Sequence, residues 1–310
     1  MEFNRRAKLD TSQIQDARGS GGGVSRGGGL ALGGGGLGVL GLVVALVINL
    51  MGGGSGAGGL SSALNNLQPG QSVNPADNAE LQQACGTGAD AMERQDCRIV
   101  AVVNSVQTMW TKIFKERGDV YLNADTRFFS GGTNTGCGSA SSAMGPFYCP
   151  ADKTVYIDLS FYEELTTKFG AQGGDFAEAY VIAHEYGHHV SNILGAMAQV
   201  GRETGADSGS VRLELQADCY AGVWAYNATR TPDPLTGEVL ITSISDDDIR
   251  EGLDAAAAVG DDYIQEKFQG NITPDTWTHG SSAQRQRWFK EGYRAGDPAA
   301  CDTFNASNLG

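Results

Sequence analysis

The amino-acid sequence predicts an α+β protein, mainly helical with a small sheet, whose folded domain follows one N-terminal transmembrane helix. Three observations predict this arrangement. An uncharged, glycine-rich and apolar stretch from Gly29 to Met51 follows a basic N-terminus. A short β-branched alternation lies at 153–159. Several longer segments carry apolar residues at the three-and-four spacing of amphipathic helices.

Size and charge restrict the class of protein. With 310 residues, 41% hydrophobic and 19% charged, the chain is long and apolar enough to bury a substantial core. Its net charge of −14 argues against nucleic acid as a partner, because phosphate binding needs clustered Lys and Arg, and the sequence has no such cluster. We therefore expect an acidic globular domain that binds no nucleic acid.

The N-terminal stretch has the length of a membrane span. Residues 29–51 would form a helix of about 34 Å, enough to cross the hydrocarbon core. The basic residues before it predict that residues 1–28 are a cytoplasmic tail, which makes the chain a single-pass protein of the cell membrane with an extracytoplasmic domain. A cleaved signal peptide, cut near Ala57, is the alternative. The basic leader before the apolar run has nearly thirty residues, which is long for the n-region of a signal peptide and favours an uncleaved anchor.

The part after the span divides into a linker and a domain. Residues 52–78 are rich in Gly, Ser, Asn and Gln, which is typical of a flexible linker, so the folded domain is predicted at 79–310. All cysteines follow the span, as expected in an oxidising compartment. Equal separations of twelve residues favour the pairs Cys85 with Cys97 and Cys137 with Cys149, which leaves Cys219 for Cys301.

Periodicity predicts the elements of the domain in order. A helix is expected at 97–116, then a strand at 153–159, which could be a sheet edge that adds an extended peptide. The helices that follow are predicted at 175–194, from 208 or 210 to 226, from 246 towards 268, and at 281–293.

A five-residue motif on the helix at 175–194 carries the chemistry. His184 and His188 are four residues apart, so both imidazoles lie on one helix face and can bind the same metal ion. Glu185 sits beside them and in this arrangement activates the water that a zinc ion holds. His189 points about 100° away from His188 around the helix and is expected to be a packed or surface residue.

A catalytic zinc ion needs a third protein ligand, and a carboxylate is expected because few histidines remain. Glu214 and Asp218 lie one turn apart on the next predicted helix. Glu214 is the candidate ligand, and Asp218 could hold a histidine ring by its second nitrogen. The alternative is a solvated helix face, but the neighbouring residues are largely apolar.

At these residues the sequence resembles the neutral zinc metallopeptidase family of bacterial envelope proteins, a gluzincin-like group with H-E-x-x-H followed by E-x-x-x-D. The matching stretches are 181–190, 211–225 and 278–289. The resemblance implies a zincin-like domain that hydrolyses peptide bonds in peptide or protein substrates. It also implies Zn²⁺ held by His184, His188 and Glu214, with Glu185 as catalytic base.

The resemblance extends to a late histidine. His279 lies in a segment like the one that faces the reacting carbonyl in related membrane metallopeptidases, so it is the candidate for stabilising the oxyanion. The alternative is that His279 only caps the last helix. Arg285 could anchor an acidic side chain such as Asp218. Arg285 and Arg287 are nevertheless left outside the predicted site, because arginines at such positions are more often surface charges.

A rival interpretation is an envelope peptide-binding or scaffold protein with a structural or catalytically degenerate zinc site. A structural zinc site is closed by four protein ligands, whereas a catalytic one keeps a position open. Counting the ligands therefore separates a structural site from a catalytic one.

Overall fold

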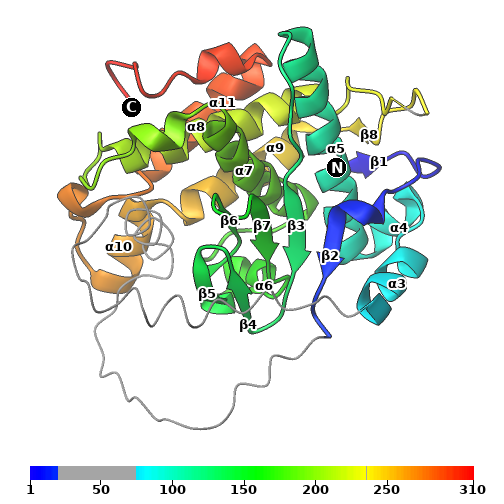
Figure 1. The fold of residues 1–310 in the computed structure, drawn as a ribbon. Coiled ribbons are helices and arrows are strands. Elements are labelled where there is room, and N and C mark those ends of the chain that lie inside the picture. The colour runs from blue at the N-terminus through cyan, green and yellow to red at the C-terminus, as the bar shows by residue number, and fades with distance from the viewer. Residues whose placement is uncertain (20–74, 235) are drawn as a thin grey trace, which may run out of the picture.

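The computed structural model describes residues 1–19, 75–234 and 236–310, and in this part of the chain the fold is α+β (Figure 1). The helices are α3 Pro75–Ala84, α4 Gly88–Glu93, α5 Gln95–Glu116, α6 Phe161–Thr167, α7 Asp175–Ile193, α8 Gly209–Asn227, α9 Asp246–Ala258, α10 Asp261–Gln269 and α11 Ser282–Ala295. The strands are β1 Glu2–Phe3, β2 Ile14–Asp16, β3 Asp125–Phe128, β4 Gly132–Thr135, β5 Gly138–Ser141, β6 Phe147–Cys149, β7 Thr154–Ile157 and β8 Ile241–Ser243.

The predicted transmembrane helix at 29–51 lies outside the described residues. Among the residues that are described, none of the helices combines the length and the apolar character that a membrane crossing requires.

Four predicted helices are confirmed as α5, α7, α8 and α11. Two of them begin where a serine caps the first turn. The Ser208 side chain accepts a hydrogen bond from the Val211 amide, and Ser281 forms a reciprocal capping box with Gln284. These caps fix the start of the helices that carry Glu214 and Arg285.

The single helix predicted from 246 towards 268 is wrong, because the chain breaks at Gly260 into α9 and α10. A Cβ at Gly260 would lie 2.5 Å from the Ser282 nitrogen, so only glycine allows this approach to α11. Asp261 and Asp262 then turn their carboxylates to the backbone amides of Thr278 and Ser282. The acidic pair anchors the 278–282 segment instead of continuing the helix.

The main sheet has the strand order β2-β3-β7-β6. Strands β2, β3 and β7 are parallel, whereas β6 pairs antiparallel with β7. The prediction that the strand at 153–159 could be an edge is wrong, since β7 lies between β3 and β6 and is buried along its length. The edge strand after β7 is β6.

Helix α8 packs against both α7 and α11, in the upper part of Figure 1. Its contact with α11 is close enough to require glycine on both sides. A Cβ at Gly222 would lie 2.1 Å from the Phe289 carbonyl oxygen, and one at Gly292 would lie 1.9 Å from that of Cys219. This contact holds Asp218 on α8 close to Arg285 on α11.

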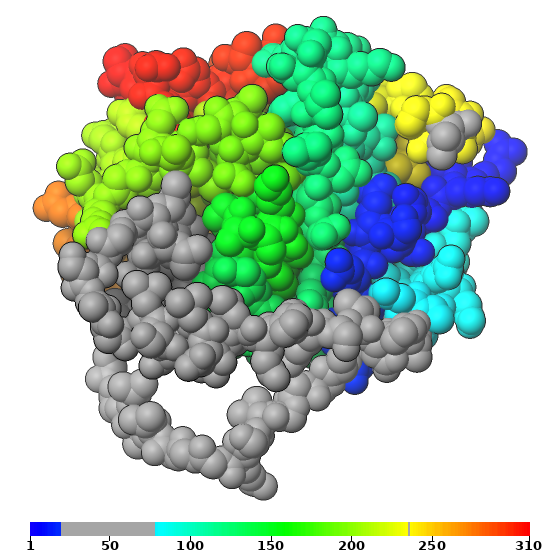
Figure 2. All heavy atoms as spheres, viewed as in Figure 1, coloured from blue at the N-terminus to red at the C-terminus, as the bar shows by residue number. Residues whose placement is uncertain are grey.

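Residues 1–19 belong to the folded domain, so the prediction of a separate tail is wrong for them. Strand β1 pairs with β8, and β2 pairs in parallel with β3. Phe3 and Ile14 are both only 3% exposed and pack into the main core. Figure 2 shows residues 1–19, in blue, lying against the cyan and teal residues of α3 to α5. Helix α3 likewise begins at Pro75, inside the predicted linker.

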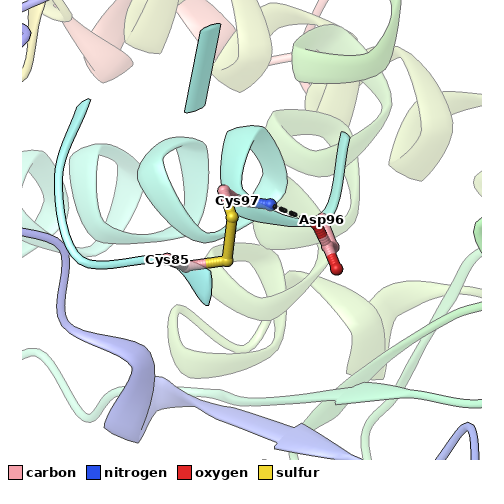
Figure 3. Close-up of side chains that lie close together, drawn as sticks. All are labelled: Cys85, Asp96 and Cys97. Atoms are coloured by element: carbon pink, nitrogen blue, oxygen red, sulfur yellow. Dashed lines mark hydrogen bonds between the residues drawn. A yellow bond between two sulfur atoms is a disulfide. The ribbon is translucent and has the colours of Figure 1, made fainter. Parts of the chain in front are cut away.

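The three predicted disulfides are confirmed: Cys85–Cys97, Cys137–Cys149 and Cys219–Cys301. Asp96 lies beside the first of them (Figure 3). This group is no metal site, because its two thiols are oxidised and the Asp96 carboxylate pairs with Arg18 and Arg94. The disulfide ties the end of α3 to the start of α5, and the ion pair of Arg18 with Asp96 ties residues 1–19 to the same place.

Candidate metal centre

Two helices bring three potential metal ligands together. His184 and His188 project from one face of α7, and Glu214 faces them from α8. The Nε2 atom of His184 lies 3.2 Å from one Glu214 carboxylate oxygen, and Nε2 of His188 lies 3.4 Å from the other. The helices approach closely at Gly187, where a Cβ would lie 2.8 Å from the Ala217 Cα atom. All three ligand residues are buried.

These residues fit a zinc ion. Tetrahedral zinc with bonds of about 2.0–2.1 Å to nitrogen and oxygen places neighbouring ligand atoms about 3.3 Å apart. The two nitrogen–oxygen distances, 3.2 and 3.4 Å, match that spacing. One ligand atom from each of the three residues lies within 4.8 Å of the others. Two imidazoles and a carboxylate form the ligand set of a catalytic zinc, which leaves a fourth position open.

Asp218 orients the first ligand. Its Oδ1 atom lies 2.8 Å from Nδ1 of His184 and accepts a hydrogen bond of 2.5 Å from the Tyr180 hydroxyl. Burial alone would raise the pKa of Asp218, but the charges of Arg285 and His184 lower it to about 2. The ionised carboxylate accepts the Nδ1 proton, so Nε2 of His184 is left to face the metal.

Arg285 is part of this network: its predicted alternative role as an anchor of Asp218 is confirmed, and the interpretation as a surface charge is wrong. The side chain is buried, and its Nε and Nη2 atoms donate to the two Asp218 oxygens at 2.8 and 3.0 Å. Nη2 also donates to the Tyr180 hydroxyl at 3.2 Å, and Nη1 to the Val259 carbonyl oxygen at 3.3 Å. The available signal was its place in the 278–289 stretch of family resemblance.

Glu185 follows the first histidine ligand and lines the same pocket as the three ligands. The pocket holds about 580 Å³ of empty space, a volume that includes open solvent at its mouth. Burial raises the pKa of Glu185 above its ordinary value. Its carboxylate is therefore a stronger base than a solvated one, as a general base requires.

His279 also lines the pocket, and Asp261 fixes it there. One Asp261 oxygen accepts the amide hydrogens of Thr278, His279 and Gly280 at 2.8, 2.7 and 3.0 Å. The other oxygen lies 3.3 Å from Nδ1 of the His279 ring. Burial would lower the pKa of His279, but the charges of Glu214 and Asp261 raise it overall.

His279 does not cap the last helix. The cap of α11 is Ser281, and the His279 side chain contacts Asp261 and the Thr278 hydroxyl instead. Asp261 was missed from the sequence, because the helix predicted from 246 towards 268 placed it in a helix interior, where an acidic residue is usually a solvated surface charge.

His189 stands apart from this site. It is buried against Tyr148, whose hydroxyl lies 2.9 Å from Nδ1, and its Nε2 lies 2.7 Å from the Leu122 carbonyl oxygen. Burial lowers its pKa, so the ring stays neutral. His189 is a packing residue.

Comparison with known proteins places the chain in a family. The sequence model of the family described as "Putative neutral zinc metallopeptidase" matches residues 1–304. The uncharacterized protein YpfJ of Escherichia coli is 40% identical over 308 residues, which cover 97% of this chain and 98% of that protein. Uncharacterized proteins of Mycobacterium bovis and Mycobacterium tuberculosis are 55% identical over 228 residues, 73% of this chain and 76% of theirs. No solved structure matches significantly. The chain therefore belongs to the neutral zinc metallopeptidase family.

Proposed function

We propose that the protein is a zinc peptidase that hydrolyses peptide bonds of peptide or protein substrates. One observation carries the proposal: Nε2 of His184, Nε2 of His188 and the Glu214 carboxylate converge in a pocket that Glu185 also lines. These three residues would hold the zinc ion. A bound zinc ion would lower the pKa of a water molecule to about 7 and polarise the carbonyl of the substrate.

Glu185 acts as the general base. Its carboxylate takes a proton from the attacking water and passes it to the leaving nitrogen, which needs a pKa above that of a solvated glutamate. Burial supplies this shift. His279 donates a hydrogen bond to the oxyanion, a contribution of about 3–4 kcal/mol for a well-placed donor. Asp261 holds the His279 ring in place for that role.

Strand β6 is the candidate for holding the substrate backbone. It is an edge of the main sheet, and Pro146, directly before it, lines the pocket. An extended peptide can add to such an edge through main-chain hydrogen bonds. This arrangement would lead the scissile bond past Glu185.

A location outside the cytoplasm is part of the proposal. It is supported by the three disulfides, because such bonds persist in oxidising compartments. The membrane anchor at 29–51 stays a prediction.

The scaffold alternative with a closed structural zinc is less favoured. Among the described residues the ligand group offers three protein ligands, and it opens into a pocket that a fourth ligand would have to close. A measurement of peptide cleavage is what distinguishes an active peptidase from a degenerate site that binds peptides without cleaving them.

The test uses the full chain, because residues 1–19 are part of the fold. Wild type and Glu185→Gln are purified, bound zinc is measured by elemental mass spectrometry, and cleavage of a mixed peptide library is followed by peptide mass spectrometry. We expect both proteins to bind one zinc ion and the variant to lose cleavage by at least about 100-fold. The control Glu203→Gln changes an exposed glutamate and should keep full activity. Cleavage by Glu185→Gln, or a wild type without zinc, contradicts the proposal.

A further inference from the structure

The pocket beside the candidate metal centre has two chemically different walls. One wall carries the histidines and carboxylates already described. The other is apolar and comes from the residue before β6, from helices α6, α7 and α9, and from the residue that follows α9. Its residues are Pro146, Phe161, Leu165, Val181, Ala255 and Val259.

The apolar wall is preformed. Phe161, Leu165, Ala255 and Val259 are buried and belong to the main core, so their positions are set by packing rather than by a ligand. Gly145 has φ of 73°, and a Cβ there would lie 3.2 Å from the Phe161 ring. The glycine therefore lets the chain before Pro146 run close along Phe161.

The charged groups next to this wall are already paired. Arg285 donates to both Asp218 oxygens and to the Val259 carbonyl oxygen, so its guanidinium is engaged away from a substrate. An acidic substrate side chain would meet the carboxylates of Glu185 and Glu214 instead. A charged side chain pressed against the apolar wall would lose its water, and the wall itself offers no polar partner.

We propose that the apolar wall binds the side chain of the substrate residue that adjoins the cleaved bond, and that the enzyme prefers apolar residues of leucine or phenylalanine size there. The proposal rests on the proposed peptidase function. One methylene in an apolar pocket changes kcat/KM by roughly 10- to 200-fold. We therefore expect leucine to exceed alanine by at least about tenfold, and aspartate or lysine to be cleaved more slowly than alanine.

The experiment uses the zinc-loaded full chain and fluorogenic peptides that differ only at one residue beside the cleaved bond: Ala, Leu, Phe, Asp or Lys. Mass spectrometry of the products identifies the cleaved bond and the side on which the preference lies. Two variants test the wall itself. Ala255→Leu fills the pocket and should reduce the preference for leucine over alanine. Val259→Ala enlarges it and should raise kcat/KM for phenylalanine relative to leucine.

The matched control is Ala257→Leu, the same substitution on the same helix at a residue that does not line the pocket. It should leave the order of the five peptides unchanged, and circular dichroism with zinc content verifies folding of each variant. Equal rates for all five peptides, or a preference for a charged residue, overturn this inference and leave the peptidase proposal intact. Failure to cleave any peptide, by contrast, counts against the peptidase function itself.

Discussion

Arg285 binds both carboxylate oxygens of Asp218, and the same carboxylate holds the ring of His184. One buried ion pair thus links helix α11 to the first candidate metal ligand, His184. Both partners are at most 3% exposed. Pairing is essential at such burial, because a lone buried charge is strongly destabilising.

Arg285→Met should lower the free energy of unfolding by about 3–5 kcal/mol, because it leaves the Asp218 carboxylate buried without its cation. Zinc affinity should fall by roughly 10- to 100-fold, since Asp218 no longer fixes His184. Chemical denaturation and chelator competition measure the two effects. Arg287→Met is the control, because Arg287 is exposed and its loss should cost less than about 0.5 kcal/mol. Equal losses of unfolding free energy and zinc affinity in the two variants would contradict the role of Arg285.

The Asp218 pair should also make stability depend on acidity. The folded pKa is lowered from 3.8 to about 2, so this stabilisation is complete above about pH 4 and is lost as the pH falls towards about 2. Over that window the zinc-free protein should lose on the order of 2 kcal/mol more than a variant that lacks the titrating group. Urea unfolding of wild type and of the double variant Asp218→Asn, Arg285→Gln provides the comparison. If the unfolding free energies of the two proteins change in parallel with pH, the predicted link between Asp218 ionisation and stability is excluded.

Glu214→Ala should weaken zinc binding by more than the roughly 10- to 100-fold cost of losing an outer partner, because it removes a direct ligand. Competition with a coloured chelator measures the dissociation constant. Glu203→Ala removes an exposed carboxylate and should bind zinc like wild type. Unchanged affinity in Glu214→Ala would assign the third ligand elsewhere.

Ile14→Ala should reduce the free energy of unfolding by about 2–5 kcal/mol, because Ile14 is 3% exposed and fills the core beside β3. The neighbouring Gln15 points to the other face of β2, so Gln15→Ala is the matched control, with an expected change below about 0.5 kcal/mol. Thermal unfolding of wild type and both variants measures the two changes in stability. A neutral Ile14→Ala would mean that the N-terminal segment adds no stability.

Local patterns predicted the helices α5, α7, α8 and α11, because apolar spacing, and in α8 and α11 a serine cap, are encoded within one segment. The equal separations of twelve residues also predicted two disulfides, and the two remaining cysteines form the third. The break at Gly260 was missed, since its cause is contact with Ser282, which is distant in sequence.

The same limit applies to the site. His184, Glu185 and His188 stand in one motif, and Glu214 was found through the spacing to Asp218. Arg285 acts through Asp218 on another helix, and Asp261 acts through the segment that carries His279, so local periodicity alone identifies neither residue as part of the site. The pairing of β2 with β3 was likewise invisible, because Ile14 to Asp16 is too short for a periodic signal.

The pairing of β2 with β3 restricts the path of the chain between residues 19 and 75. While β2 remains in the sheet and α3 remains packed against it, residues 19 and 75 belong to one folded body. A connection that starts and finishes on the same side of a bilayer must cross it an even number of times, zero included. A single crossing by the predicted span would therefore require β2 to leave its place beside β3.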